Sequence, residues 1–111
     1  MTYKLDKIKN ISADIWHEFS IQLDAKLISI MLIYTRGRYR AFKNSCPHQG
    51  RRMDYSLGKF LLTPEGNIVC PAHGAEFNSD SGLCVNGPCL GESLQEVQIE
   101  TNEGFVFAII E

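Results

Sequence analysis

Two short stretches of this 111-residue chain each carry one cysteine and one histidine at a spacing that allows them to bind a common metal site. Cys46 and His48 form the first pair, and Cys70 and His73 form the second. Two thiolates and two imidazoles suit a tetrahedral zinc ion. They also suit a [2Fe–2S] cluster with cysteines on one iron and histidines on the other. A third interpretation is that the four residues are unconnected.

The order of the candidate ligands favours the iron–sulfur cluster over zinc. Zinc fingers present a cysteine pair and then a histidine pair, whereas each stretch here is mixed. A mixed loop can place its cysteine on one iron and its histidine on the other, so two such loops hold a cluster from both sides. Neutral imidazoles stabilise the iron that receives the electron, which raises the reduction potential above that of an all-thiolate cluster.

Glycine and proline flank the candidate ligands in both stretches. Pro47 and Pro71 directly follow the cysteines, where they fix φ and lower the entropy lost when the loops close. Gly50 and Gly74 follow the histidines. Glycine lets the backbone turn tightly and bring N–H groups close to sulfur, and such hydrogen bonds tune a cluster's potential.

With these residues in place, the chain resembles the Rieske [2Fe–2S] family. The resemblance continues to Phe77, Gly82 and the pair Gly87-Pro88, which in the family lies in a loop that covers the cluster. It implies an all-β fold, a Rieske-type antiparallel β-sandwich with a small cluster-binding subdomain inserted between strands. It also implies a single domain over residues 1–111, with the subdomain at about 44–90.

The resemblance assigns Cys46, His48, Cys70 and His73 as the ligands of one [2Fe–2S] cluster per chain. One departure from the family is the distance between the loops, since 21 residues separate His48 from Cys70. We expect the additional residues to lie in 52–64 and to lengthen a hairpin without disturbing the ligand loops.

The resemblance also predicts a low potential. High-potential members carry a serine two residues and a tyrosine four residues after the second histidine, and their hydroxyls donate to sulfur. Ala75 and Phe77 occupy these positions here and cannot donate from their side chains. We therefore expect a potential below zero, in the lower part of the range of roughly −150 to +300 mV.

Two further cysteines lie outside the ligand loops. In high-potential Rieske proteins a disulfide joins the two loops, but Arg51 and Ala72 stand at the matching positions. We expect Cys84 to be a small buried hydrophobic residue near the cluster and Cys89 to be a free thiol. A bridge between these two has no support in the sequence. A native bridge between the two ligand cysteines is disfavoured, because nothing marks the chain as secreted.

Composition narrows the functional classes. A net charge of −2 gives no electrostatic basis for binding nucleic acid. No run of 18 apolar residues is present, so we expect no spanning helix and no membrane association. The first residues show neither a twin-arginine nor a secretory pattern, which predicts a cytoplasmic protein.

Alternation of apolar and polar residues predicts mostly strands. Leu27–Thr35 is apolar at nearly every position and β-branched, which indicates a strand buried on both faces. One short helical turn is predicted at Ala13–Phe19, after Ser12. The remaining predicted strands are Tyr3–Ile8, Ser20–Leu23, Tyr39–Lys43, Lys59–Thr63, Asn67–Val69, Leu94–Thr101 and Phe105–Ile110.

Four other residues have both a functional and a structural interpretation. His17 is either an extra ligand or proton carrier or a partly exposed histidine, and Trp16 is either a docking anchor or a core aromatic; we favour the structural role for both. Arg51 and Arg52 can dock an acidic partner or raise the potential. We favour solvated loop charges for this pair.

The resemblance implies a soluble ferredoxin that is not itself an enzyme. It would accept one electron from a flavin-dependent ferredoxin reductase and pass it to a terminal oxygenase, as a monomer that meets both partners transiently. A Rieske oxygenase needs a second iron site with two histidines, and only His17 remains after His48 and His73. Two alternatives stay open: the small subunit of a nitrite-reductase-like enzyme, and a metal-bound interaction module without a redox role.

Overall fold

The computed structural model describes residues 1–110, whose regular structure is almost entirely β-strand. These residues contain no α-helix, and a single 3₁₀ turn, η1, spans Ile8–Asn10. The strands are β1 (Thr2–Lys7), β2 (His17–Leu23), β3 (Lys26–Thr35), β4 (Arg38–Lys43), β5 (Asp54–Ser56), β6 (Lys59–Leu62), β7 (Ile68–Val69), β8 (Glu76–Phe77), β9 (Cys84–Asn86), β10 (Glu96–Asn102) and β11 (Phe105–Ile109).

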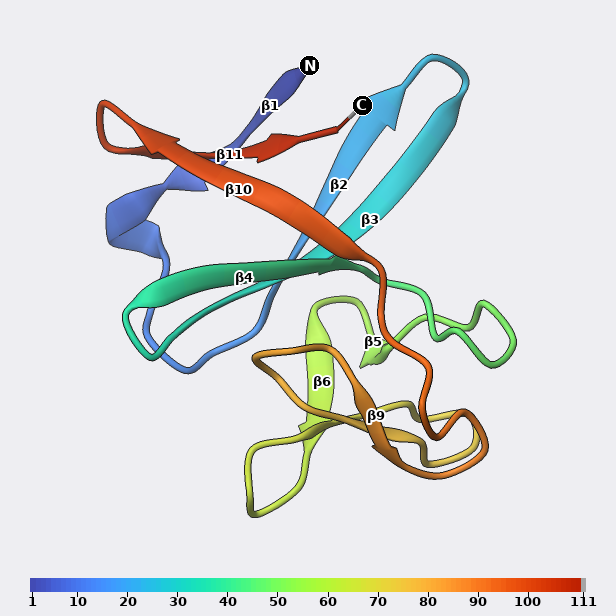
Figure 1. The fold of residues 1–111 in the computed structure, drawn as a ribbon. Helices are drawn as coiled ribbons and strands as arrows, with labels where there is room; N and C mark the ends of the chain where they lie inside the picture. The colour runs from blue at the N-terminus through green and yellow to red at the C-terminus, as the bar shows by residue number, and fades with distance from the viewer. Residues whose placement is uncertain (111) are drawn as a thin grey trace.

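The strands form two antiparallel sheets, one above the other in Figure 1. The first has six strands in the order β1-β11-β10-β4-β3-β2, and it encloses an apolar core of its own. The second has five strands in the order β5-β6-β7-β8-β9 and is inserted in the chain between β4 and β10. This confirms the predicted all-β fold, with a smaller sheet inserted between strands of the larger one.

Strand β3 is buried on both faces over residues 30–33, whereas Leu27, which the prediction included, is 67% exposed. Ile30 and Leu32 belong to the core of the six-stranded sheet, whereas Met31 and Ile33 belong to a second core that faces the five-stranded sheet. Because successive side chains of a strand point to opposite faces, one uninterrupted apolar run serves both cores. The candidate ligands Cys46 and Cys70 lie in the second core.

Aromatic side chains and a glycine join the two sheets. Trp16 is buried, with its ring centroid 6.3 Å from that of Phe42 and 5.9 Å from that of Phe60. Gly82 lies directly against Phe42, since a Cβ at this position would come within 2.6 Å of the Phe42 ring. Trp16 is therefore a core residue, which confirms its structural interpretation.

The predicted helical turn at Ala13–Phe19 is wrong. Ala13 instead forms an isolated bridge with Tyr34, and Asp14 N–H donates to Tyr34 O at 2.8 Å. From His17 onward the chain is strand β2, which pairs with β3 over its whole length. The strand predicted at Ser20–Leu23 thus begins three residues earlier, at His17. Long-range pairing with β3 outweighs the weak local preference for a helical turn.

Candidate metal centre

The first ligand loop runs from Cys46 to Arg51, directly after the hairpin of β3 and β4. Cys46 N–H donates to Arg51 O at 2.7 Å, and Gly50 N–H donates to Cys46 O at 2.7 Å. Gly50 has a φ of +68°, a left-handed conformation that glycine adopts without strain. His48 lies between these two closing bonds, so its position depends on backbone contacts at both ends of the loop.

The second ligand loop, Cys70 to Ala75, closes in the same way. Cys70 N–H donates to Ala75 O at 2.8 Å, and Gly74 N–H donates to Cys70 O at 2.9 Å. Gly74 has a φ of +74°, close to the value at the equivalent position of the first loop. The two loops therefore share one backbone scaffold, although His73 is one residue further from its cysteine than the histidine of the first loop.

A third loop repeats this scaffold without any candidate ligand. Asn78 N–H donates to Leu83 O at 2.9 Å, and Gly82 N–H donates to Asn78 O at 2.8 Å, with a φ of +77° at Gly82. The loop is tied to β4 because Arg38 forms an ion pair with Asp80 at 3.0 Å. Glycine four residues after the first loop residue is the sequence signal shared by all three loops.

The two cysteine sulfurs lie on the inner side of the centre. Cys46 and Cys70 are each only 2% exposed and are free thiols. Burial raises the pKa of the Cys46 thiol, a hydrogen bond from the His48 backbone N–H lowers it, and the neighbouring Cys70 sulfur raises it again. Two neighbouring buried thiols both lose their protons only where a cation compensates the two negative charges.

The two histidines lie on the outer side of the centre. His48 and His73 are exposed, and their ring centroids are 5.2 Å apart with an angle of 84° between the ring planes. The structure thus brings the four predicted ligands together as a buried sulfur pair and an exposed imidazole pair. Both imidazoles therefore reach the surface.

The candidate donors fall into a buried sulfur pair and an exposed nitrogen pair. Within residues 1–110 no three side chains of Cys, His, Asp or Glu converge closely enough to hold a single ion. A [2Fe–2S] cluster with two sulfurs on one iron and two nitrogens on the other needs only two donors at each iron. The arrangement of the sulfur and nitrogen donors therefore fits the cluster better than it fits tetrahedral zinc.

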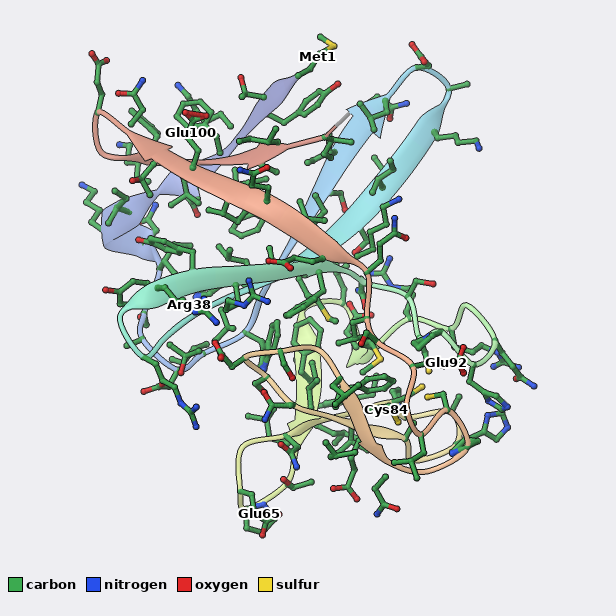
Figure 2. The ribbon with its side chains drawn as sticks, in the orientation of Figure 1. Met1, Arg38, Glu65, Cys84, Glu92 and Glu100 are labelled. Carbon is green, nitrogen blue, oxygen red and sulfur yellow. The ribbon has the colours of Figure 1, made fainter. Side chains whose placement is uncertain are left out.

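Two further thiols lie beside the ligand sulfurs. Cys84 and Cys89 are both buried in the same core as Cys46 and Cys70, and their Sγ atoms are 3.4 Å apart. Figure 2 shows sulfur atoms gathered beside the labelled Cys84. Burial, and next to it the contact with Cys84, raises the pKa of Cys89 to about 12. Both cysteines are free, and the burial of Cys84 is as predicted.

The loop that carries Gly87 and Pro88 packs on the second ligand loop. Gly87 has a φ of +103°, and a Cβ on it would come within 2.8 Å of Ala75 Cα. Ala75 and Phe77 are both fully buried, at the positions where the sequence lacks hydroxyl donors. The structure therefore leaves no room at Gly87 for any side chain, a requirement that sequence spacing alone does not reveal.

The two arginines of the first loop differ in their contacts. Arg52 donates to both oxygens of Asp54 at 2.9 Å, and it also reaches Glu18 at 3.5 Å. The Asp54 side chain is only 1% exposed. Burial alone would raise the pKa of Asp54, but hydrogen bonds from Arg52 and from the Gly58 N–H hold it below its usual value. Arg52 is exposed like Arg51, with 48% of its side chain accessible, but it also has a structural contact with Asp54 that its interpretation as a solvated loop charge did not include.

His17 does not join the centre. It lies half-buried in β2, paired with Leu32 of β3, and its ring stacks on Phe19 at 6.3 Å. Its Nε2 is buried and has no hydrogen-bond partner among the described residues. The favoured structural interpretation of His17 agrees with this position on the six-stranded sheet.

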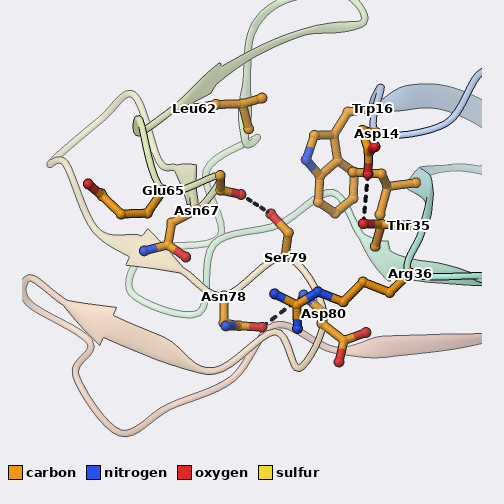
Figure 3. A pocket seen from close by; sticks show the side chains of 12 residues that line it. Asp14, Trp16, Thr35, Arg36, Leu62, Glu65, Asn67, Asn78, Ser79 and Asp80 are labelled. Atoms are coloured by element: carbon orange, nitrogen blue, oxygen red, sulfur yellow. Dashed lines mark hydrogen bonds between the residues drawn. The ribbon is translucent and has the colours of Figure 1, made fainter.

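A pocket of about 450 Å³ opens between the two sheets, away from the ligand loops. Figure 3 shows its polar lining, where Thr35 Oγ1 donates to Asp14 Oδ1 at 2.8 Å and Ser79 donates to the Gly66 carbonyl. Trp16 borders this pocket, and none of the four candidate ligands does. The pocket is thus separate from the metal centre.

The Rieske [2Fe-2S] domain family matches residues 3–102 of the chain. The chain belongs to the Rieske [2Fe–2S] family. The cofactor of this family is a [2Fe–2S] cluster, one per chain, and the paired sulfur and nitrogen donors described above fit it. The family membership therefore favours a [2Fe–2S] cluster over zinc as the cofactor of this chain.

Known proteins of this Rieske family include both small carriers and parts of larger chains. The ferredoxin component of the alkene monooxygenase system of Xanthobacter autotrophicus is 30% identical over 73 residues, which cover 66% of this chain and 57% of that protein. Apoptosis-inducing factor 3 of Homo sapiens is 32% identical over 78 residues, covering 70% of this chain and 12% of that protein. The matched region thus spans little more than half of the first relative and about a tenth of the second.

Solved structures share the Rieske fold. The ferredoxin of carbazole 1,9a-dioxygenase from Nocardioides aromaticivorans superposes with a TM-score of 0.73 at 14% identity, covering 100% of this chain and 99% of that one. A complex of reduced oxygenase and oxidised ferredoxin of carbazole 1,9a-dioxygenase gives a TM-score of 0.72 at 18% identity, covering 96% of this chain and 91% of the matched chain. At these identities the likeness establishes the fold alone.

Residues 1–110 contain no helix with the length and apolar character needed to cross a membrane.

Proposed function

We propose that Cys46 and Cys70 bind the inner iron of the cluster and that His48 and His73 bind the outer iron. The observation that carries the proposal is the separation of the donors into a buried thiol pair and an exposed imidazole pair with ring centroids 5.2 Å apart. When bound, the cluster takes up and releases one electron. The exposed histidine edges then mark the side at which the electron enters and leaves.

The surrounding residues orient the ligands and exclude water from the sulfurs. Burial raises the pKa of the Cys46 thiol, but the backbone N–H of His48 lowers it and so favours negative charge on that sulfur. The packing of Gly87 on Ala75 covers the second ligand loop. Strands and closed loops hold these groups before the electron arrives, so little reorganisation accompanies its transfer.

The role that fits this site is a one-electron carrier that receives electrons from a flavin-dependent ferredoxin reductase and delivers them to a terminal oxygenase. Supporting this role are the alkene monooxygenase ferredoxin among its relatives and the fold shared with a carbazole dioxygenase ferredoxin. In this role the chain is a monomeric cytoplasmic domain over residues 1–111, with its cluster-binding part at about 44–90, and it performs no catalysis itself.

The docking face in this proposal comprises the exposed histidines and the stretch that carries the Gly-Pro pair. Three apolar residues of the stretch that carries the Gly-Pro pair, Leu83, Val85 and Leu90, are exposed, and Leu90 is the most exposed of the three at 67%. A small apolar surface of this kind suits a transient contact, in which a modest area is buried and released at each cycle. Arg51 lies in the adjoining ligand loop and is free to meet an acidic group of the partner.

Cluster analysis tests the ligand assignment. We expect two irons and two acid-labile sulfides per chain, and an EPR signal after reduction with dithionite. His73→Ala is expected to abolish this signal, while His17→Ala leaves it intact. Retention of the wild-type spectrum in His73→Ala would remove that histidine from the ligand set.

Electron delivery tests the carrier role. A flavin-dependent ferredoxin reductase with NADH should reduce the holoprotein rapidly, and a terminal oxygenase should reoxidise it in the presence of substrate. Gel filtration is expected to show a monomer that forms no lasting complex with either enzyme. Permanent co-purification with a larger enzyme would contradict a freely diffusing carrier.

A further inference from the structure

Two thiols that the proposed ligand set does not use lie side by side in the loop of the Gly-Pro pair. Cys84 and Cys89 are each 1% exposed, and Cys89 Sγ donates to Cys84 Sγ at 3.4 Å. A disulfide bond is about 2.05 Å long, so the two sulfurs need to approach each other by only about 1.4 Å. Rotations about the Cα–Cβ bonds of two side chains produce movements of this size. The structure thus holds two free thiols in a position to form an intramolecular bridge.

The backbone of a single residue, Glu92, holds both cysteines in place. Cys84 N–H donates to Glu92 O at 2.8 Å, and Glu92 N–H donates to Cys89 O at 2.9 Å. Gly91 N–H also donates to Cys84 O, at 3.4 Å. The two ends of the loop are therefore already close together before any bond forms between the sulfurs, so little further loop entropy is lost when a bridge closes.

The segment that covers the two thiols is thin. Residues 85–88 and 90–93 are all exposed, so the buried sulfurs lie beneath a short stretch of chain that is in contact with solvent. Exposed segments with few buried contacts open at a lower free energy than the core of a protein. Burial raises the pKa of Cys89 to about 12, so this thiol keeps its proton while the loop is closed. Reaction with a reagent in solution therefore takes place when the segment opens.

We propose that Cys84 and Cys89 form a reversible redox site, which a low-molecular-weight disulfide of the glutathione type oxidises to an intramolecular bridge. One cysteine loses its proton and its sulfur attacks the S–S bond of the oxidant, which breaks and releases one small thiol. The second cysteine then loses its proton and attacks the mixed disulfide, so the protein S–S bond forms as the second small thiol leaves. Two electrons thus pass from the protein to the oxidant, and an excess of the small thiol reverses the reaction.

The bridge closes a ring around Gly87 and Pro88, and this ring has a consequence for the second ligand loop. Gly87 packs on Ala75 of that loop, since a Cβ on Gly87 would come within 2.8 Å of Ala75 Cα. A cross-link reduces the number of open conformations that the Gly-Pro loop can adopt. The bridged protein therefore loses its cluster more slowly than the dithiol form. This consequence, unlike the bridge itself, rests on the proposed role of Cys70 as a ligand.

Peptide mapping of the oxidised holoprotein tests the bridge without relying on activity. The protein is incubated with glutathione disulfide, separated from it, denatured in excess alkylating agent and cleaved after glutamate. Cleavage after Glu76 and Glu92 releases residues 77–92, which contain Cys84 and Cys89 and neither proposed ligand cysteine. We expect this peptide to be lighter by two hydrogen atoms and to carry no alkyl group, and dithiothreitol should restore two alkylatable thiols. Two alkyl groups after oxidation, attached glutathione alone, or a bridge to a ligand cysteine would overturn the proposal.

Comparison with the unfolded chain shows whether the fold itself favours the bridge. At one fixed ratio of glutathione to its disulfide, we expect the ratio of bridged to dithiol peptide to be at least about tenfold higher in the native protein than in guanidinium chloride. This corresponds to about 30 mV for a two-electron couple. Equal ratios would mean that the short spacing in the sequence is sufficient, and they would refute the proposed site. Cys84→Ser and Cys89→Ser each leave one thiol in the peptide and are expected to give no bridged product.

Retention of the cluster tests the effect on the ligand loop. The half-life of the visible cluster absorption at elevated temperature is expected to be about two- to tenfold longer in the bridged protein than in the dithiol form. Cys84→Ser, treated with the same oxidant, should show no increase. Equal half-lives of the two wild-type forms would refute the fastening of the Gly-Pro loop. The peptide result does not depend on which residues bind iron, so a failure of the ligand assignment and a failure of the bridge are distinguished.

Discussion

Gly87 Cα lies so close to Ala75 that a Cβ on Gly87 would approach Ala75 Cα to 2.8 Å. The contact joins the Gly-Pro loop to the second ligand loop, and the nearest atom on the side of the ligand loop is a backbone atom of Ala75. Ala75 cannot move away without a loss of stability, because its carbonyl oxygen accepts the closing hydrogen bond from Cys70 N–H at 2.8 Å. The Gly-Pro loop and the second ligand loop are thus a single packed unit.

We predict that Gly87→Ala destabilises this unit and speeds the loss of the cluster. The substitution combines a steric clash with a φ of +103°, whereas Gly91 has a φ of +92° and a Cβ added there would meet nothing within 4 Å. Gly91→Ala is therefore a matched control, since it carries backbone strain of about 1–3 kcal/mol without the clash. The half-life of the visible cluster absorption at elevated temperature measures the difference. Equal half-lives of the two variants would contradict the packing argument.

Ala75→Ser is predicted to raise the midpoint potential. Ala75 is fully buried in the second ligand loop, at the position where high-potential Rieske proteins carry a serine that donates to sulfur, so a hydroxyl there meets no competing water. One added hydrogen bond of about 0.5–1.5 kcal/mol corresponds to about 20–65 mV for a one-electron couple. Spectroelectrochemical titration measures the shift. Ala72→Ser, at an exposed position of the same loop, is the control and should leave the potential nearly unchanged.

The buried carboxylate Asp54 predicts how stability depends on pH. Its pKa is lowered in the folded protein, so the stabilisation it provides is complete above the unfolded value of about 4 and is lost as the pH falls through the folded value. Asp54→Asn should therefore flatten the decrease in stability below pH ~4. The single tryptophan, Trp16, is buried between the sheets, and its fluorescence can follow urea unfolding at each pH. Glu100→Gln, at an exposed position, should keep the wild-type pH dependence.

Arg52→Gln tests the same contact from the other side. Removing the guanidinium leaves the Asp54 carboxylate buried with fewer donors, and we expect a loss of about 1–3 kcal/mol in the free energy of unfolding at pH 7. Arg51→Gln, one residue earlier and exposed, should cost much less. If both variants unfold at the same urea concentration, Arg52 has no structural role.

Leu90 is predicted to contribute to docking in the proposed carrier role. Leu90→Asp should slow electron transfer to a terminal oxygenase about five- to tenfold, as expected for the loss of a central apolar contact worth more than about 1 kcal/mol. Leu27→Asp is the matched control, because Leu27 is also 67% exposed but lies in β3 of the six-stranded sheet. Stopped-flow reoxidation measures the rates, and unchanged midpoint potentials show that only docking is affected.

Local patterns in the sequence were sufficient for the parts of the fold that depend on periodicity. The apolar run of β3 predicts burial on both faces, which the structure shows for residues 30–33. The two strands predicted at Lys59–Thr63 and Asn67–Val69 are present as the paired strands β6 and β7. The mixed spacing of cysteine and histidine indicates the two ligand loops. The match to the Rieske [2Fe–2S] domain establishes the family of the chain. The assignment of each ligand to an iron stays a prediction.

Features that depend on distant parts of the chain were not predictable in the same way. The segment before β2 forms no helical turn because Ala13 and Asp14 contact Tyr34. The sequence predicts that Arg52 is a solvated loop charge. In the folded structure it contacts the buried Asp54, which lies in β5. Burial and partner choice at these positions are set by tertiary packing, which a single sequence encodes only indirectly.

The third closed loop, from Asn78 to Leu83, shows that the scaffold of the ligand loops does not require a ligand. Its closing bonds are made by backbone groups and a left-handed glycine, as in the two loops that carry cysteine and histidine. The shape of each loop is therefore independent of the chemistry it presents. Evolution or design can exchange the donor atoms of such a protein while its architecture stays constant, so new metal specificities are accessible by changing a few side chains alone.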